Sequence, residues 1–411
     1  MHIPCLKCKG RDPARFCGRT FCPLIAKSMA RFNVEKKLTK SDFFGASPAP
    51  FIGHYGYPNL NVGVLSPPDQ PENISEYDAP RFWAEHNYQI PQIINFRSEL
   101  INSRFNAHVK DTNNFIEIAQ EVGMASKPVD IEINLKDKPQ FRVKTDSFTA
   151  PMGPNAKLKK ADITSNPKIS SKVEKVVSDT DLKANPAITY LYDKGFDENF
   201  LSKLLSVGTL GLKYNRKLVP TRFSITAVDD MIGKELINKI KNHSTSNYLA
   251  YFGSYLGNYY LVLLFPEIWS YELFETYMPH ASWNIAKEIN YTTDYENYHG
   301  RKNYAESTAG GYYASRVSIL EKLNQLKRQA SILCLRFITG EYATPLGVWC
   351  VREATRKAMN NKPIEFSSKE MMLNYAKHLV KKKFNFDLYK ILNNSILLKN
   401  MKQQSKLTNF I

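Results

Sequence analysis

The sequence predicts an α+β fold (mixed α/β), in which a mixed sheet with packed helices leads to a helical C-terminal region and a flexible tail. Short stretches with alternating apolar residues and longer stretches with apolar residues at helical spacing occur in both halves of the chain. Of the 411 residues, 43% are hydrophobic. A chain of this length and hydrophobic content can form two or three domains with their own cores.

The predicted organisation has five segments, whose boundaries follow changes in composition. A cysteine-rich segment opens the chain, and a polar segment rich in Lys and Pro interrupts it near the middle. The segments are a four-cysteine finger at 1–25, a mixed α/β N-terminal region at 26–150, the polar connecting segment at 151–187, an α/β C-terminal domain at 188–399 and the tail at 400–411.

Four of the six cysteines fall within the first 22 residues. Cys5 and Cys8 have C-x2-C spacing, and Cys17 and Cys22 have C-x4-C spacing. Two such thiolate pairs fit the tetrahedral coordination of Zn2+, so the sequence predicts a zinc knuckle. An iron–sulfur cluster, or free or disulfide-linked thiols, are the alternatives.

The N-terminal region is expected to combine hairpins, helices and a strand. Gly- and Pro-rich residues 43–68 predict one or two β-hairpins, with His54, Tyr55 and Tyr57 either near a ligand or simply on the surface. Helices are predicted from Pro91 to Asn106, with Arg97 and Arg104 on the exposed side, and from Asp111 to Met124. Residues 129–133 alternate apolar and acidic side chains and predict a half-buried strand.

The polar segment 151–187 is expected to be a long loop. Its lysines could contact phosphates as a strap, although a solvated charge run is the simpler interpretation. These residues are Lys157, Lys159, Lys160, Lys168 and Lys172.

The second half predicts a sheet of at least three strands and several helices. β-Branched residues at 218–226 indicate a strand, after which Asp229 and Asp230 would open a helix. Gly257-Asn258 marks a hairpin between 248–256 and 259–265. Apolar residues from Val317 to Phe337 at helical spacing predict one long helix. Two more helices are expected, at 368–383 and 387–399.

Gly310 and Gly311 lie at the start of the long predicted helix, where free backbone amides could bind a phosphate. Basic and aromatic side chains nearby could add charge and stacking. The candidate nucleic-acid- or nucleotide-binding residues are therefore Arg216, Arg222, Arg301, Tyr304, Gly310, Gly311 and Arg316. A tight turn without a ligand is the alternative explanation for the two glycines.

Carboxylates in the same half could hold a divalent ion for phosphodiester chemistry. The candidate catalytic residues are Asp229, Asp294 and Glu296. Spacing alone does not bring them together, and Asp229 could serve only as a helix cap.

The net charge of +17 and the pI of about 9.4 indicate a nucleic-acid partner or, less often, an anionic membrane. No apolar run reaches the roughly 18 residues of a spanning helix. The first residues also lack the pattern of a signal peptide. The sequence therefore predicts a cytoplasmic, nucleoid-associated protein with reduced or metal-bound cysteines and no membrane contact.

The last eight residues carry a polar residue followed by apolar residues at +3, +6 and +7. These are Gln404, Leu407, Phe410 and Ile411. The spacing resembles the PCNA-interacting peptide, in which an apolar plug enters a pocket of the DNA sliding clamp. A last helical turn packed on its own domain is the alternative.

Three blocks in the second half, LVPTRFSITAVDD, DYENYHGRKNYAESTAGGYYASR and PLGVWCVRE, resemble the archaeal Nre family of DNA repair proteins. The resemblance extends over nearly all of the chain, including the four-cysteine segment and the tail. It implies a role in archaeal DNA repair and recruitment to PCNA. The zinc ligands that the resemblance implies are Cys5, Cys8, Cys17 and Cys22. The clamp-binding residues that it implies are Gln404, Leu407, Phe410 and Ile411. Clamp peptides often carry an aromatic residue where this chain has Ile411.

Three hypotheses for function follow. A PCNA-recruited repair protein that processes nucleic acid or a nucleotide predicts that Asp229, Asp294 and Glu296 converge with the Arg, Tyr and Gly-Gly block on one pocket. A non-enzymatic adapter that binds DNA and the clamp predicts a broad basic face without a carboxylate cluster. An RNA- or ribosome-associated protein would also account for the basic charge and the finger.

Overall fold

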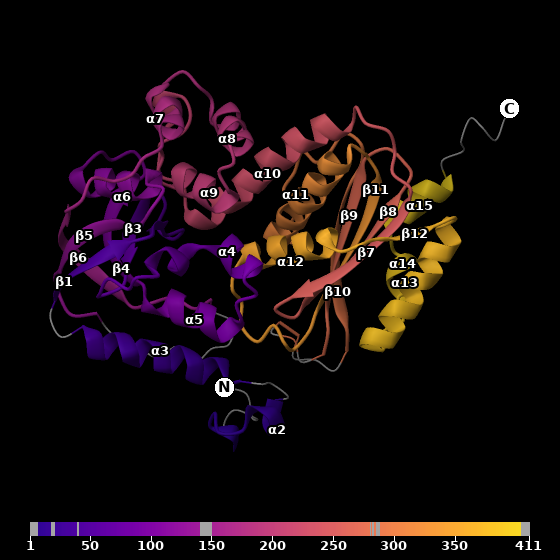
Figure 1. Ribbon diagram of the computed structural model, residues 1–411, viewed down its shortest axis with the longest axis horizontal. Helices are drawn as coiled ribbons and strands as arrows, with labels where there is room; N and C mark the ends of the chain where they lie inside the picture. Colours follow the sequence, from indigo (N-terminus) through magenta and orange to yellow (C-terminus); the bar gives the residue numbers. More distant parts are fainter. Residues whose placement is uncertain are drawn as a thin grey trace. The chain divides into compact units, whose positions relative to one another are not determined.

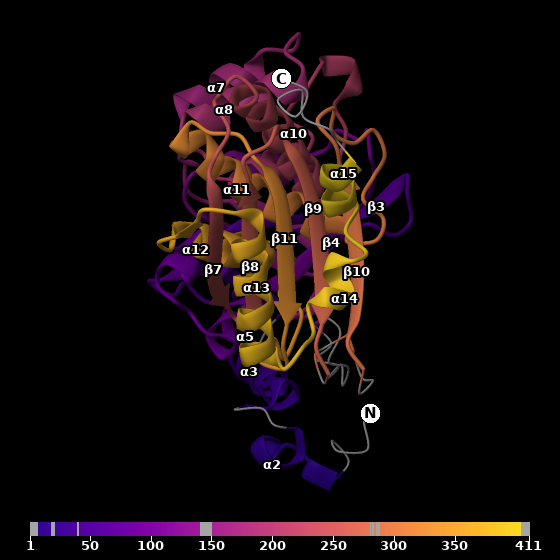
Figure 2. The same ribbon diagram turned by 90° about the vertical axis from the view of Figure 1, so that its right-hand side faces the viewer.

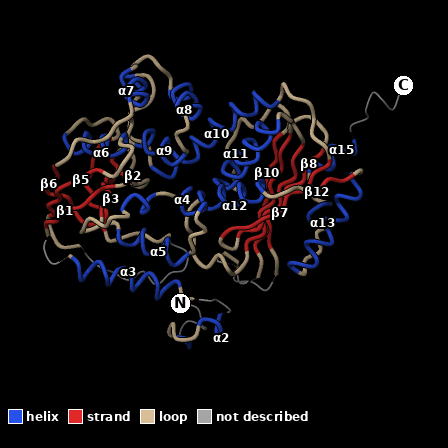
Figure 3. The backbone as a smooth tube through the Cα atoms, viewed as in Figure 1, coloured by secondary structure: helices blue, strands red, loops and turns tan. Residues whose placement is uncertain are grey.

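The computed structural model describes residues 7–17, 21–38, 41–139, 150–279, 281, 283–284 and 288–403. The chain divides into two compact units. The first unit contains Met1–Ile232 with Ala343–Leu346, and the second contains Gly233–Tyr342 with Gly347–Ile411. Each unit contains a six-stranded mixed sheet, whose strands are red in Figure 3. The expected mixture of sheet and helices is thereby confirmed.

The first sheet has the strand order β1-β5-β6-β4-β3-β2. Its strands are antiparallel except for the parallel pair β4 and β6. β2 and β3 form the predicted hairpin, and β5 contains the predicted strand at 129–133. The bounds are β1 Asp42–Ser47, β2 Ala49–Ile52, β3 Asn59–Ser66, β4 Ile101–His108, β5 Val129–Leu135 and β6 Asn155–Ile163.

The helices of the first unit support this sheet. Helix α6 packs against β2, β3 and β6, and its Ile116, Ala119 and Val122 enter the core. Asn113 caps α6 by accepting a hydrogen bond from the backbone N–H of Ile116. The helices are α2 Pro13–Cys17, α3 Pro23–Lys37, α4 Pro80–Glu85, α5 Ile90–Glu99, α6 Asn114–Met124, α7 Ser171–Ser178, α8 Ala184–Asp193 and α9 Glu198–Ser206, with 3-10 turns η1 Ile74–Asp78 and η2 Lys213–Asn215. Helix α10 Thr221–Ile240 begins in the first unit and continues into the second after Ile232.

Two predictions in the first unit are wrong. The helix expected from Pro91 to Asn106 ends at Glu99, and Arg104 lies on strand β4. The segment 151–187 is not a long loop, because β6 lies within it and places Ala156, Leu158 and Ala161 in the core. The lysines between these apolar residues mark the solvent face of a half-buried strand.

Helix α10 replaces the strand predicted at 218–226. Thr221 begins the helix directly after Pro220, and its hydroxyl accepts a hydrogen bond of 2.9 Å from the backbone N–H of Ile52. Asp229 is therefore a fully buried residue about two turns into α10 and does not cap it. Tertiary contacts here outweigh the β propensity of the local sequence.

The second sheet has the strand order β10-β9-β11-β8-β7-β12, and only β9 and β11 are parallel. The predicted hairpin is confirmed, because β7 and β8 pair around Gly257, which has a φ of +75°. The bounds are β7 Tyr248–Tyr255, β8 Asn258–Phe265, β9 Ser270–Tyr277, β10 Asn290–Glu296, β11 Ser331–Ile338 and β12 Ile364–Phe366.

Helices cover both faces of the second sheet (Figures 1 and 2). Helices α11 (Ala309–Leu326) and α12 (Val348–Asn360) lie on one face. On the other face lie α13 (Lys369–Phe384), α14 (Tyr389–Leu392) and α15 (Ile396–Gln403). Side chains of this second group of helices share a core with the strands, including Ala376, Val380, Leu263 and Leu335.

The long helix predicted from Val317 to Phe337 is only partly correct. Helix α11 ends at Leu326, after which Lys327 adopts a left-handed conformation with a φ of +53°. Residues 331–338 form β11, in which every residue is buried. A strand buried on both faces loses its apolar–polar alternation and can imitate a buried helix in sequence.

The C-terminal helices follow the prediction more closely. The helix expected at 368–383 is confirmed by α13, whereas the stretch 387–399 is divided between α14 and α15. In the part of the chain that the structure describes, no helix is long and apolar enough to cross a membrane. The predicted clamp peptide at 404–411 lies outside the described residues.

Candidate functional site

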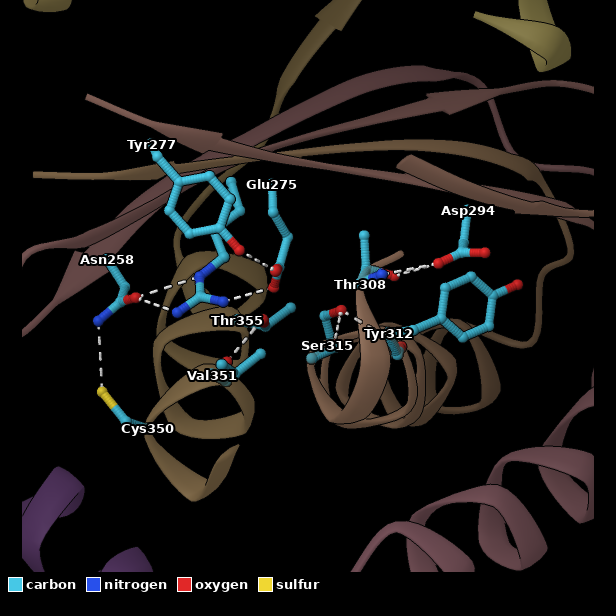
Figure 4. A network of polar contacts seen from close by, with 12 residues as sticks. Asn258, Glu275, Tyr277, Asp294, Thr308, Tyr312, Ser315, Cys350, Val351 and Thr355 are labelled. Atoms are coloured by element: carbon cyan, nitrogen blue, oxygen red, sulfur yellow. Dashed lines mark hydrogen bonds and ion pairs between the residues drawn. The ribbon is translucent and has the colours of Figure 1, made fainter. Parts of the chain in front are cut away.

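A polar layer lies between the second sheet and helices α11 and α12, and it contains the candidate residue Asp294 (Figure 4). In an antiparallel pair, residues directly opposite one another share a face of the sheet. Thr292 lies opposite Glu275, and Glu296 lies opposite Tyr271. Glu275 of β9 and Glu296 of β10 therefore lie on the same face of the sheet and point toward the same helices.

Asp294 binds the beginning of helix α11. Its Oδ2 accepts hydrogen bonds of 2.8 Å from both the backbone N–H and the hydroxyl of Thr308, the residue before the helix. Its Oδ1 lies 3.1 Å from a guanidinium nitrogen of Arg301. A carboxylate is favourable at the partly positive end of a helix. Asp294 thus occupies the place that the sequence assigned to a bound phosphate.

Arg301 is held by the loop around it. Its guanidinium donates to the backbone carbonyls of Tyr295, Asn303 and Tyr304 at 3.0, 3.3 and 3.1 Å. Its charge also lies 5.3 Å from the ring centroid of Tyr312, within the range of a cation–π contact. Arg301 therefore fixes the loop between β10 and α11.

Glu296 and Arg316 form a buried ion pair. Their charged atoms are 2.8 Å apart, and the side chains are only 0% and 1% exposed. The Arg316 guanidinium also lies 5.6 and 5.3 Å from the rings of Tyr312 and Tyr313. Gly233 of α10 leaves room for it, because a Cβ there would lie 3.1 Å from an Arg316 nitrogen. This pair joins β10 to α11 and positions both charges inside the core.

A second buried ion pair joins Glu275 of β9 to Arg336 of β11. The Tyr277 hydroxyl donates to the other oxygen of Glu275 at 3.0 Å. Asn258 Oδ1 accepts from Arg336 at 3.1 and 2.5 Å, and its amide nitrogen lies 3.4 Å from the sulfur of Cys350. The network thereby connects three strands with α12 (Figure 4).

Burial sets the ionisation of this network. Burial opposes the charge of Arg336, but the facing Tyr260 and Glu275 outweigh it and raise its pKa. Burial raises the pKa of the Cys350 thiol to about 12 and that of the Tyr312 phenol well above its ordinary value. At neutral pH the thiol and the phenol are neutral, while Arg336 is charged.

Gly310 and Gly311 lie in the first turn of α11 rather than in a loop before it. A Cβ at Gly311 would lie 2.3 Å from the Glu275 carboxylate, which is closer than real atoms approach. Glycine is therefore required for α11 to approach β9. The exposed Tyr304 stacks on Tyr313, with ring centroids 5.4 Å apart.

The remaining predicted residues of this half belong to the first unit. Arg216 donates to the carbonyls of Gly211, Val177 and Asp179 at 2.8 to 3.0 Å, so its charge holds the backbone together. Arg222 is exposed at the start of α10. Asp229 is buried within α10. The structure thus brings Asp294, Glu296, Arg301, Arg316 and Gly311 into one layer of the second unit.

Three of the four predicted zinc ligands lie among the described residues. Cys8 is buried, Cys17 is exposed at the end of α2, and Cys22 precedes α3. Cys5 lies outside the described residues. The turn after Cys8 ends at Gly10, where a Cβ would lie 3.8 Å from the sulfur of Cys22, so Cys8 and Cys22 border the same turn. Within the described ranges no group of three or more His, Cys, Asp or Glu side chains is arranged to hold a metal.

Sequence reasoning missed the pair Glu275–Arg336 and its partner Asn258. A usable signal was present, since a single arginine interrupts the apolar run of 331–338 and two glutamates interrupt that of 270–277. A charge within a strand that is otherwise apolar is almost always paired when it is buried.

Comparisons with known proteins cover nearly the whole chain. The family model described as Archaeal Nre, N-terminal, matches residues 16–284, and the one described as Archaeal Nre, C-terminal, matches residues 296–410. The DNA repair protein NreB of Archaeoglobus fulgidus is 36% identical over 98% of this chain and 99% of its own length.

Two further relatives carry a similar name. The DNA repair protein NreA of Haloferax volcanii is 38% identical over 76% of this chain and 77% of its own length. The DNA repair protein NreA of Archaeoglobus fulgidus is 35% identical over 93% of this chain and 95% of its own length. No solved structure matches the chain.

Proposed function

Because the chain belongs to the archaeal Nre family, we propose that it is a DNA repair protein that binds DNA and is recruited to the PCNA sliding clamp by its C-terminal peptide. The observation that carries the proposal is the similarity, over 98% of the chain, to a relative named as a DNA repair protein. The net charge of +17 supports a polyanionic partner.

The peptide Gln404–Ile411 would extend from a fixed base. Helix α15 ends at Gln403, and its first backbone N–H groups donate to the carboxylate of Glu272 at 2.9 Å (Ile396) and 3.1 Å (Leu397). Eight extended residues reach about 26–29 Å. A short peptide on such a base would let the clamp hold the second unit close to DNA.

Replacement of Phe410 by Ala tests clamp recruitment. Phe410 is the aromatic anchor of the proposed plug, and loss of a buried anchor typically weakens binding by about 30-fold or more. We expect Phe410→Ala to lose binding to immobilised PCNA in surface plasmon resonance while its thermal melting stays that of the parent. Thr408→Ala, between the anchors, is the matched control. Equal binding by Phe410→Ala and the parent would refute recruitment through this peptide.

We also propose that the four N-terminal cysteines hold zinc. Cys8 and Cys22 border one turn, and thiolate ligands suit this metal. When bound, the metal would supply structural cross-linking to a segment of few apolar residues. The full chain should contain one zinc per molecule by elemental analysis, and Cys17→Ser should lose it, whereas Cys350→Ser should keep it. Iron with a visible absorption band would identify the cluster alternative, and a metal-free parent would overturn both.

A non-enzymatic adapter is the second candidate function. It is favoured by the engagement of both carboxylates of β10, since Asp294 binds Thr308 and Arg301, and Glu296 binds Arg316. Side chains tied in this way stabilise the fold rather than remain available to a substrate. A labelled DNA substrate incubated with the full chain and Mg2+ or Mn2+ should remain intact. Cleavage by the parent that is lost in a folded Asp294→Asn variant would instead establish a processing enzyme.

A further inference from the structure

Two segments of the first unit, far apart in sequence, build one continuous surface. The turn between β2 and β3 (residues 53–58) lies beside the segment 213–223, which includes the first residues of α10. Three hydrogen bonds join them through the end of β4: Ile52 N–H to the hydroxyl of Thr221 (2.9 Å), Val109 N–H to the carbonyl of Pro58 (2.9 Å) and Leu218 N–H to the carbonyl of Val109 (2.8 Å).

This surface exposes four large aromatic side chains. Tyr55 and Tyr57 in the turn are 77% and 63% exposed, and Tyr214 and Phe223 in the second segment are 73% and 54% exposed. The His54 ring lies against that of Tyr55, with centroids 3.9 Å apart. Single exposed aromatic residues are common, but a group of them on adjoining segments marks an interaction site.

The two segments themselves carry only basic charge, and the acidic residues Asp111 and Asp179 border them. Neither 43–68 nor 199–228 contains an acidic residue, whereas the second segment contains Lys213, Lys217 and Arg222, all exposed. Burial lowers the pKa of His54, and the charge of Arg222 lowers it further. At the edge, Lys110 is exposed, and the carboxylate of Asp111 accepts the backbone N–H of His108 at 2.7 Å. A polyanion is the complementary partner.

We propose that this surface binds a single-stranded segment of DNA. Unpaired bases would stack on Tyr55, Tyr57 and Phe223, and the phosphates between them would contact Arg222 and Lys217. Stacking of this kind needs base faces that a duplex does not offer, and it tolerates any sequence because every base has such a face. The proposal deepens the proposed DNA repair function and rests on it for the choice of DNA over RNA.

The rigid base of the turn fits this role. Gly56 has a φ of +87°, and a Cβ there would lie 2.7 Å from the backbone oxygen of Asn59, so the turn requires glycine. A fixed turn holds Tyr55 and Tyr57 outward before any ligand arrives, which lowers the entropy lost on binding.

The test uses the full chain and fluorescence anisotropy with three labelled oligonucleotides of about 16 residues: oligothymidylate, a DNA duplex and oligouridylate. The variant Tyr55→Ala/Tyr57→Ala/Phe223→Ala should bind oligothymidylate about 100-fold or more weakly than the parent, while duplex binding stays within about twofold, since each stacked base contributes roughly tenfold. The control is Tyr389→Ala on α14, a tyrosine that is 56% exposed outside this surface.

Charge is tested separately with Arg222→Ala. Loss of one phosphate contact should reduce the slope of log affinity against log salt for oligothymidylate by about 0.7. Arg328→Ala, an exposed arginine elsewhere, should leave the slope unchanged. As a second readout, photocrosslinking of a bromodeoxyuridine oligonucleotide to the parent should label peptides that contain Tyr55, Tyr57 or Phe223.

The outcomes separate this proposal from the one it rests on. Equal binding of oligothymidylate by the triple variant and the parent, with crosslinks elsewhere, overturns the surface but leaves DNA binding in place. Stronger binding of oligouridylate than of oligothymidylate, lost in the triple variant, identifies RNA as the partner. A parent that binds no DNA of any form overturns both the surface and the proposed DNA function.

Discussion

At the scale of single residues, the second unit depends on charges that are buried but paired. Glu296 and Arg316 are almost inaccessible to water and form an ion pair within the core. The attraction between buried ions compensates for lost hydration only while both partners are present. Removal of one partner therefore costs far more than replacement of both.

Arg316→Met should lower the free energy of unfolding by about 3–5 kcal/mol, because it leaves the Glu296 carboxylate buried without its cation. The double variant Glu296→Leu/Arg316→Met should recover most of that loss. Urea denaturation followed by circular dichroism measures both changes. A double variant as unstable as the single one would show that Arg316 acts through other contacts.

Gly311→Ala should also destabilise the chain, by about 1–3 kcal/mol, since the added methyl group meets the Glu275 carboxylate. The sign of this change in stability is informative, because Gly→Ala at an unconstrained helix position raises the free energy of unfolding by about 1 kcal/mol. Gln325→Ala on the exposed end of α11 is the control and should be neutral or stabilising. Thermal melting of the two variants decides the comparison.

At the scale of elements, helix α15 is attached to the second sheet by one carboxylate. Glu272 of β9 accepts hydrogen bonds from the hydroxyl of Ser395 and from the backbone N–H groups of Ile396 and Leu397. Ser395 in turn caps the helix, because its hydroxyl accepts from the N–H of Leu398 at 3.1 Å. Burial is the strongest influence on Glu272 and raises its pKa above the ordinary 4.5, although the hydrogen bonds oppose it.

This raised pKa predicts a pH dependence. The native state holds the Glu272 proton more tightly than the unfolded chain, so the contribution of Glu272 to stability is greatest below pH 4.5 and declines as pH rises through the folded pKa. Glu272→Gln stays neutral and lacks this decline. The difference in melting temperature, parent minus Glu272→Gln, should therefore fall as pH increases from 4 upward. A difference that grows with pH would contradict the raised pKa.

At the scale of the whole molecule, the excess of 56 basic over 39 acidic residues gives the net charge of +17. Basic side chains displace the counterions of nucleic acid, and this release makes affinity depend on salt. For a footprint of six to ten phosphates, binding of duplex DNA by the full chain should weaken by about 10³–10⁵-fold between 50 and 200 mM salt. An anisotropy titration at several salt concentrations gives the slope. A slope near zero would exclude an electrostatic footprint of this size.

The parts of the fold that could be predicted are those specified by local patterns. Alternation identified β5, the Gly257-Asn258 pair identified the β7–β8 hairpin, and helical spacing identified α6. Strand β5 and helix α6 each have one face toward a core and one toward solvent, so their period is visible in the sequence, whereas the hairpin is marked by its turn residues. The four-cysteine segment and the tail also carry local signals, and the zinc site and the clamp peptide that they indicate stay predictions.

The sequence by itself therefore determined the class of the fold, the basic charge and the family to which the chain belongs. Only the tertiary structure decided that 331–338 is a strand, since burial on both faces removes its period. It likewise decided that Asp294 binds the start of α11 and that Glu296 pairs with Arg316. Those partners lie 14 and 20 residues apart along the chain, and only the packing of α11 on the second sheet brings them together.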